Sequence, residues 1–185
     1  MFRTLTFVAA FAGCATILSA QAIDPDTFKV SYFANDYSPS YSETVRVTNV
    51  GTSGGNICAD FYVFDPNQEL SECCSCLVTP DGLLSLNVHN ALLSNPLTGV
   101  DLVTGAIKIV SAATTGGACP LPTAPKPTSG VRAWATHIQG DDVLTETDFL
   151  DSGLSAVELG RLAAQCSAVQ LVGSGKGVCD CRNPG

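Results

Sequence analysis

Residues 57–76 read ICADFYVFDPNQELSECCSC, a stretch in which two alternating segments flank a turn. Every second residue of the first segment is apolar, which gives an extended strand one apolar face made of Ile57, Ala59, Phe61 and Val63. The opposite face would carry Cys58, Asp60, Tyr62 and Phe64. The DPN sequence at 65–67 favours a chain reversal. The stretch therefore predicts a β-hairpin.

The same two-residue period returns along the first two-thirds of the chain, in residues 27–33, 43–50, 84–89, 107–109 and 131–138. In residues 43–50, for example, Val45 and Val47 are expected to face inward, and Arg46 outward. Segments rich in Gly, Pro, Asn and Asp separate the runs. We therefore predict a mainly β fold, an antiparallel β-sandwich of the immunoglobulin-like or a related type.

The C-terminal part, about residues 152–185, has a different pattern. Ser155 and Glu158 form an S-x-x-E capping box, and apolar residues follow at helical spacing as far as Val169. Gly173 and Gly175 are expected to end this helix. The sandwich should therefore carry a helical, cysteine-containing C-terminal element.

Residues 120–127 contain four prolines, Pro120, Pro122, Pro125 and Pro127. Proline cannot donate a hydrogen bond to a neighbouring strand, so a central strand is excluded here. The segment should form an extended surface connection.

Residues 1–22 have the pattern of a secretory signal peptide: a positive start, an apolar run, and Ala20-Gln21-Ala22 as the cleavage signal. The apolar run is short for a membrane span, which needs about 20 residues. Cys14 in FAGC loosely resembles a lipidation site, but Phe11 stands where Leu is usual. We expect residues 23–185 to form a single domain that is secreted, periplasmic or held at the cell surface.

The chain is acidic, with 9 Lys and Arg against 17 Asp and Glu and a formal net charge of -8. Loss of residues 1–22 would remove only Arg3 and change -8 to -9. No cluster of basic residues interrupts this acidity, which argues against nucleic acid as a partner. No later apolar run is long enough for stable membrane insertion of the mature chain. A protein or a glycan remains as a possible ligand.

Nine cysteines become eight when Cys14 leaves with the signal peptide: Cys58, Cys73, Cys74, Cys76, Cys119, Cys166, Cys179 and Cys181. An even number in an exported chain predicts up to four disulfides. A metal site is the alternative, but C-x₂-C spacing occurs only at Cys73 and Cys76. We expect disulfides, with no metal and no cofactor.

Hairpin geometry suggests a first pairing, because a turn at 65–67 brings Cys58 level with Ser75, give or take one residue. The expected partner of Cys58 is then Cys74 or Cys76. The helical Cys166 is expected to pair with one of the two tail cysteines, at 179 and 181. This leaves the cysteine at 119 for a remaining thiol of the cluster or the tail.

Other candidate sites are less specific. An acidic segment offers oxygen ligands of the type that Ca²⁺ prefers, in Asp141, Asp142, Glu146, Asp148 and Asp151, but it lacks the EF-hand pattern and is expected to be a solvated loop. Exposed aromatic side chains for a glycan would come from Tyr32, Tyr37 and Tyr41, with Asn35 and Asp36 as polar partners. We expect His89 on a solvated strand face and His137 half-buried. No serine-hydrolase or phosphate-loop motif is complete, so no catalytic residue is assigned.

The segments ICADFYVFDPNQELSECCSC, LLSNPLTG and IKIVS, together with the ending LAAQCS and GSGKGVC, resemble a family of exported, cysteine-rich bacterial proteins that has no assigned activity. The resemblance implies export and disulfides and transfers no catalytic residue. VRVTNVGTSGG also resembles the early strands of immunoglobulin-like adhesion modules.

These observations lead to one functional expectation and two alternatives. We expect an exported structural or surface-binding protein rather than an enzyme, because no coherent catalytic set is present. The first alternative is a secreted hydrolase that uses Asp or Glu, and the second is a thiol-based metal or redox protein.

Overall fold

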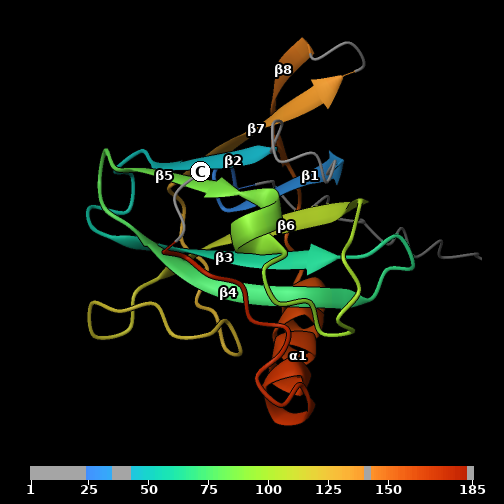
Figure 1. The fold of residues 1–185 in the computed structure, drawn as a ribbon. Coiled ribbons are helices and arrows are strands. Elements are labelled where there is room, and N and C mark those ends of the chain that lie inside the picture. The colour runs from blue at the N-terminus through green and yellow to red at the C-terminus, as the bar shows by residue number, and fades with distance from the viewer. Residues whose placement is uncertain (1–23, 35–42, 140–142, 183–185) are drawn as a thin grey trace, which may run out of the picture.

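A computed structural model describes residues 24–34, 43–139 and 143–182. Along these residues the strands are β1 (Phe28–Ala34), β2 (Thr44–Asn49), β3 (Ile57–Phe64), β4 (Leu70–Val78), β5 (Leu83–Asn87), β6 (Thr104–Ala113), β7 (Val131–Gln139), β8 (Val143–Asp148) and β9 (Leu150–Asp151). A π-helical turn, η1 (Val88–Leu92), follows β5, and the helix α1 (Ala156–Val172) lies near the C-terminus (Figure 1). The signal-peptide prediction for residues 1–22 lies outside the described residues, as do Asn35, Asp36, Tyr37, Tyr41, Asp141 and Asp142.

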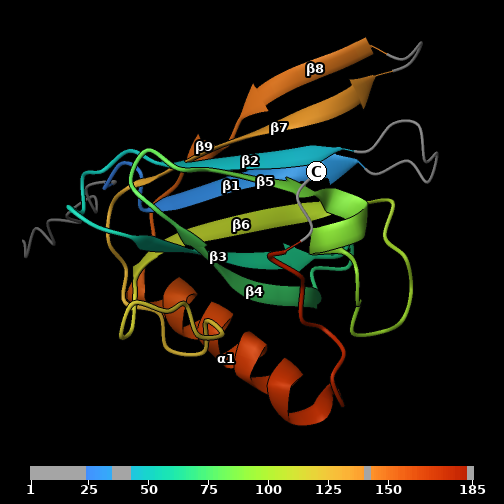
Figure 2. The same cartoon turned by 60° about the vertical axis from the view of Figure 1, so that its left-hand side comes forward.

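The strands form two sheets, and within each sheet all neighbouring strands pair antiparallel. One sheet has five strands in the order β4-β3-β6-β1-β9, and the other has four in the order β5-β2-β7-β8. Figure 2 shows the two layers one above the other, with β8 leading into β9 and so from one sheet to the other. The predicted antiparallel β-sandwich with a C-terminal helix is confirmed.

The main core lies between the two inner faces. Val45 and Val47 from β2 are completely buried there, as are Ile107 and Ile109 from β6. Arg46 points to the opposite face of β2 and is half-buried. The in-and-out pattern read from residues 43–50 is therefore confirmed, because a strand turns successive side chains to opposite faces.

A second core covers the outer face of the five-stranded sheet, and all eight residues of β3 are buried as a result. Phe64 and Tyr62 on this face belong to one apolar cluster with Leu162 and Val169 of α1. The Tyr62 hydroxyl donates a hydrogen bond to the carbonyl oxygen of Pro122, 3.1 Å away, so the proline-rich segment lies against the same face. The outer face of the four-stranded sheet has no such cover from the described residues, as Figures 1 and 2 show.

The helix begins and ends as the sequence predicts. The Ser155 hydroxyl accepts a hydrogen bond from the backbone N–H of Glu158 at 3.0 Å, and Gly173 is the C-cap. Leu162, Cys166 and Val169 are its buried residues, one on each successive turn. None of the described helices combines the length and the hydropathy needed to cross a membrane.

Two local expectations were wrong. Cys58 lies opposite Leu77 rather than Ser75, because the turn is centred on Asn67 and a bulge beside Phe64 adds another residue to β4. His89 does not lie on a strand face: β5 ends at Asn87, and His89 lies in η1.

Candidate functional site

All eight cysteines of residues 23–185 form disulfides, which confirms the predicted bonding state. The pairs are Cys58–Cys119, Cys73–Cys166, Cys74–Cys179 and Cys76–Cys181, with Cα–Cα distances of 5.5, 5.9, 5.3 and 5.5 Å. The expected pairings were wrong, since no disulfide joins the two strands of the hairpin and none joins the helix to the tail. Four disulfides fit an extracytoplasmic protein, because such bonds persist in oxidising compartments.

The alternation of β4 explains these pairings. Cys74 and Cys76 point into the core between the sheets, whereas Cys73 belongs to the outer cluster beneath α1. Cys58 is also on the outer side, opposite Leu77, so neither inward cysteine of β4 can reach it. Adjacent cysteines in the sequence therefore bond to different elements, one to the helix and the next to the tail.

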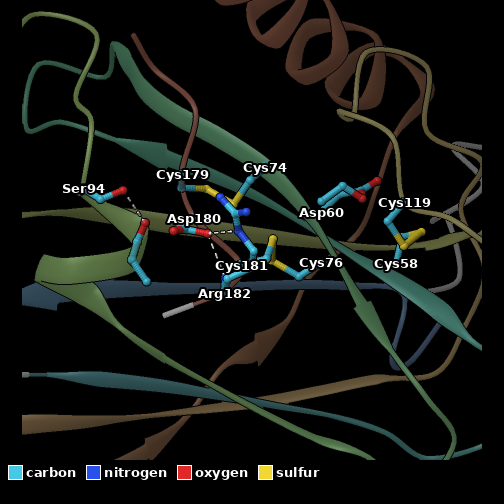
Figure 3. The surroundings of a disulfide bond; sticks show 12 residues. Cys58, Asp60, Cys74, Cys76, Ser94, Cys119, Cys179, Asp180, Cys181 and Arg182 are labelled. Atoms are coloured by element: carbon cyan, nitrogen blue, oxygen red, sulfur yellow. Dashed lines mark hydrogen bonds and ion pairs between the residues drawn. A yellow bond between two sulfur atoms is a disulfide. The ribbon is translucent and has the colours of Figure 1, made fainter. Parts of the chain in front are cut away.

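The tail that carries Cys179 follows the free edge of β4. The backbone N–H of Cys73 donates to the carbonyl oxygen of Gly177 at 2.9 Å, and the N–H of Gly177 donates to Asn95 at 2.7 Å. Further along, the N–H of Asp180 donates to the carbonyl oxygen of Ala91 at 3.0 Å. The tail therefore covers an edge that would otherwise expose unpaired backbone groups. Figure 3 shows its two disulfides next to one another.

Three carboxyl groups are buried at separate places in the sandwich. Burial raises the pKa of Glu43 to about 8 and that of Asp60 to about 7, although hydrogen bonds from Ala34 and Ser75, respectively, oppose these shifts. Burial also raises the pKa of Glu72 to about 8, against a backbone hydrogen bond from Asn95 and the positive charge of Lys176. At pH 7 the carboxyl groups of Glu43 and Glu72 are therefore mostly protonated, and that of Asp60 is partly protonated.

His137 lies beside one of these carboxyl groups. Its Nδ1 atom faces Glu43, and its ring stacks on Tyr32 with centroids 4.7 Å apart. The side chain of His137 is only 2% exposed, so this histidine is buried more completely than the half-buried state that was expected. Burial lowers the pKa of His137, which favours the neutral ring. Tyr32, one of the proposed glycan contacts, lies here.

The calcium candidates that can be placed do not form a cage. Glu146 and Asp148 are exposed on β8, while Asp151 lies on β9 in an ion pair with Lys29. Among the described residues, these carboxylates form no group of three within ligand distance of one another. The other two candidates lie outside the described residues.

A groove of about 610 Å³ lies at the corner where the chain passes from β8 to β9; we call it the corner groove. Its polar and aromatic wall residues include Thr48, Arg132, Trp134 and Asp148, which share the uncovered outer face of the four-stranded sheet, and Asp26, Lys29 and Asp151 from the neighbouring edge. Trp134 is half-buried and lies opposite Asp148 in the strand register.

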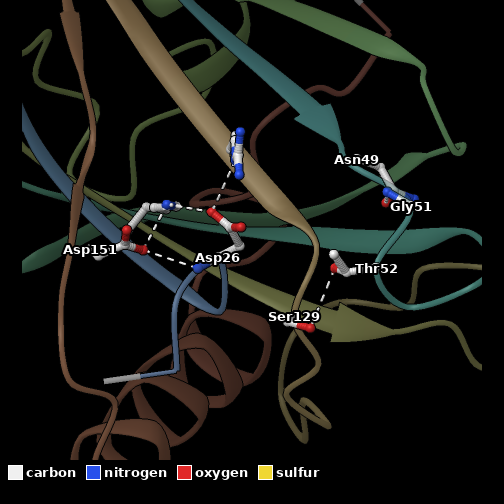
Figure 4. Close-up of polar contacts among 8 residues, drawn as sticks. Asp26, Asn49, Gly51, Thr52, Ser129 and Asp151 are labelled. Atoms are coloured by element: carbon white, nitrogen blue, oxygen red, sulfur yellow. Dashed lines mark hydrogen bonds and ion pairs between the residues drawn. The ribbon is translucent and has the colours of Figure 1, made fainter. Parts of the chain in front are cut away.

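An ion network centred on the buried Lys29 forms one wall of this groove. Lys29 Nζ lies 3.0 Å from Asp26 Oδ1 and 2.7 Å from Asp151 Oδ1, although Lys29 itself is only 4% exposed. The backbone N–H of Asp26 also donates to Asp151, and Arg132 Nε lies 3.4 Å from Asp26. Figure 4 shows Asp26 and Asp151 joined by these contacts. The network fixes the groove wall, since each charge in it has a partner.

Sequence reasoning did not identify this groove. The alternation of Ala133 and Ala135 with Arg132 and Trp134 shows that the indole ring points outward, and this signal was available. The contact between Lys29 and Asp151 could not be predicted from the sequence, because these residues are far apart in the chain and no local pattern links them.

The fold and these contacts define a disulfide-stapled antiparallel β-sandwich with an open corner groove. No family model, no curated protein and no solved structure matches the chain. The resemblance to exported cysteine-rich bacterial proteins therefore stays an expectation.

Proposed function

We propose that this protein is an exported, non-enzymatic binding protein and that its corner groove holds a sugar unit of a glycan. The observation that carries the proposal is the groove itself, which joins an indole ring to fixed charges of both signs on an uncovered sheet face. Export is supported by the signal-peptide pattern and by the four disulfides, which persist in oxidising compartments.

The side chains of the groove suit a sugar. Sugar hydroxyls both donate and accept hydrogen bonds, so they can pair with the Asp148 carboxylate, the Arg132 guanidinium and the Thr48 hydroxyl. The apolar face of a sugar ring can pack on Trp134, because an indole combines a large apolar surface with a polar edge. Because the Lys29 network is already formed, little ordering of that wall is needed on binding.

The groove is less suited to the hydrolase alternative. General acid catalysis by a carboxyl group needs a raised pKa. Burial acts to raise the pKa of Asp151, but hydrogen bonds from Lys29 and from the backbone of Asp26 outweigh it and leave that pKa lowered. The carboxyl groups with raised pKa values, Glu43, Asp60 and Glu72, are absent from the groove wall. Binding without turnover is therefore the better proposal.

A glycan array followed by calorimetric titration of the best ligand tests this function. Trp134→Ala should weaken binding about ten-fold or more, because loss of an aromatic contact worth about 1.4 kcal/mol changes affinity ten-fold. The matched control is Leu83→Ala, which removes an exposed side chain, 62% accessible, from the same sheet face but outside the groove wall. Its affinity should equal that of the wild type.

Three results would reject the proposal. The first is an array on which the wild-type protein binds no glycan, and the second is equal weakening by Trp134→Ala and Leu83→Ala. The third is hydrolysis of the bound glycan at a rate that Trp134→Ala or Asp148→Asn reduces, which would favour the secreted hydrolase. Far-ultraviolet circular dichroism of each variant confirms that the comparison is between folded proteins.

A further inference from the structure

We propose that the chain, before its thiols are oxidised, holds one soft metal cation of the Zn²⁺ class between Cys74, Cys76, Cys179 and Cys181. These four residues are called the tetracysteine box below. In the oxidised protein they form the two disulfides of the tail. The inference is independent of the proposed function, because β4 and β9 form opposite edges of the five-stranded sheet and the box shares no residue with the corner groove.

The geometry of the box comes from two neighbouring extended segments. Cys74 and Cys76 lie two residues apart on the inner face of β4, so their Cα atoms are about 6.7 Å apart. Across from them, Cys179 and Cys181 lie at Cα–Cα distances of 5.3 and 5.5 Å from their partners. Figure 3 shows the two pairs next to each other, while the pair Cys58 and Cys119 lies elsewhere along the sheet.

The sulfur atoms are already close to a coordination shell. The Sγ atoms of Cys74, Cys76 and Cys181 all lie within 4.8 Å of one another. Cys179 is bonded to Cys74 but lies outside this group of three. Tetrahedral zinc with Zn–S bonds of about 2.3 Å needs sulfur atoms about 3.8 Å apart. Once the two S–S bonds are absent, the side chain of Cys179 has to turn toward the other three thiols to complete that arrangement.

Backbone contacts can place the tail without the help of the disulfides. The three hydrogen bonds that join Cys73 to Gly177, Gly177 to Asn95, and Asp180 to Ala91 involve main-chain atoms alone. A parallel bridge between Cys73 and Val178 adds to them. A reduced tail therefore has its own reason to lie along β4, with its two thiols facing the thiols of the strand.

The chemistry needs no electron transfer. Thiolates are the preferred ligands of soft cations, and four cysteine thiols lose four protons when they bind one Zn²⁺. Cys74 and Cys76 are 3% and 1% exposed, which shields the bonded metal from water, while Cys181 is half-buried and offers a path of entry. Oxidation ends this state: as each pair of thiolates forms its S–S bond, it gives two electrons to an external disulfide, which takes up two protons and leaves as two thiols, and the cation is released.

The other cysteines serve as internal controls. Cys73 and Cys166 meet in the outer cluster beneath α1, and Cys58 and Cys119 meet beside the proline-rich segment, so neither pair faces the box. Every cysteine begins as a thiol, and those of the tail are made last. A cation in the box would keep four thiols of the reduced chain from pairing with the wrong partners.

The test is a titration of reduced residues 23–185, the chain without Cys14, with Co²⁺ and then Zn²⁺ in the absence of oxygen, followed by absorption spectroscopy. Four variants each replace one bonded pair by alanine, so that no odd thiol remains. We expect one equivalent of Co²⁺ with intense thiolate-to-cobalt absorption in the wild type, in Cys58→Ala/Cys119→Ala and in Cys73→Ala/Cys166→Ala. In the variants that remove Cys74 with Cys179, or Cys76 with Cys181, affinity should fall at least 100-fold.

Two outcomes would overturn the proposal. One is a wild-type chain that gives no thiolate-to-cobalt absorption. The other is the same cobalt affinity in all four paired variants, because that is the behaviour of thiols in an unfolded chain. Mass mapping during reoxidation provides a second measurement: Zn²⁺ should slow closure of the two tail disulfides at least ten-fold and leave Cys58–Cys119 unchanged, and equal rates would count against the box.

Discussion

Asp60→Asn should make this protein more stable in neutral and basic solution and leave its stability in acid almost unchanged. Asp60 is 2% exposed on the outer face of β3, where the proline-rich segment covers it. Its described hydrogen-bond partner is the Ser75 hydroxyl, and no ion pair to a cation is found among the described residues. A carboxylate formed here loses its hydration, and the single hydrogen bond from Ser75 compensates only part of that loss.

The magnitude follows from the raised pKa. Burial raises the pKa of Asp60 from its ordinary value of 3.8 to about 7. Between these two values the unfolded chain has lost a proton that the folded chain keeps, so the free energy of unfolding falls as pH rises. Each pH unit in this window is worth about 1.4 kcal/mol, which gives a loss of about 4 kcal/mol between pH 4 and pH 7. Asparagine has no proton to lose and should escape this loss.

The assay is urea denaturation of the wild type and Asp60→Asn at pH 4, 6 and 8. Glu43 and Glu72 lower stability over a similar pH range in both proteins, so the difference between the two isolates Asp60. We expect that difference to grow by about 4 kcal/mol from pH 4 to pH 8. Asp101→Asn, at an exposed aspartate, is the matched control and should follow the wild type. A difference that stays constant within about 1 kcal/mol would refute the idea that the folded protein keeps this carboxyl group dry.

Two further predictions concern stability. Replacing Cys58 and Cys119 together by alanine should lower the free energy of unfolding by about 4 kcal/mol, because the disulfide closes a loop with a sequence separation of 61 residues. Calorimetry measures this loss against the disulfide-intact protein, and an unchanged melting temperature would contradict the prediction. Gly105→Ala should lower the free energy of unfolding, measured by urea denaturation, by about 2 kcal/mol or more, since a Cβ atom there would collide with the carbonyl oxygen of Phe64. Gly160→Ala, in open space on α1, should instead stabilise the protein by about 0.5–1 kcal/mol. Equal effects of the two changes would disprove this packing account.

Local sequence patterns predicted the individual elements well. The alternation in residues 43–50 was enough to assign the inward position of Val45 and Val47, and the Ser155 capping box was enough to place the start of α1. Such patterns work because helices and strands repeat over two to four residues, within the reach of a short sequence window. They failed at the hairpin, where a bulge near Phe64 shifted the register that the turn alone suggested.

The candidate sites depended on longer-range information. The position of Trp134 on an outer face could be read from alternation, but the groove beside it needed β9 to bring Asp151 to Lys29. The buried state of Asp60 likewise depended on a proline-rich segment that begins about sixty residues later in the chain. Neither contact can be predicted from the residues that flank it in the sequence.

The amino-acid sequence by itself determined which side chains of a strand face inward, where the helix starts, and that the eight cysteines beyond residue 22 would form disulfides. Only the tertiary structure decided which cysteines meet. On β4, Cys73 and Cys74 are neighbours in sequence, yet they point to opposite sides of the sheet, one toward α1 and the other toward the tail. The identity of the element that lies on each side is a property of the whole chain path, because a disulfide forms between residues that are close in space however far apart they are in sequence.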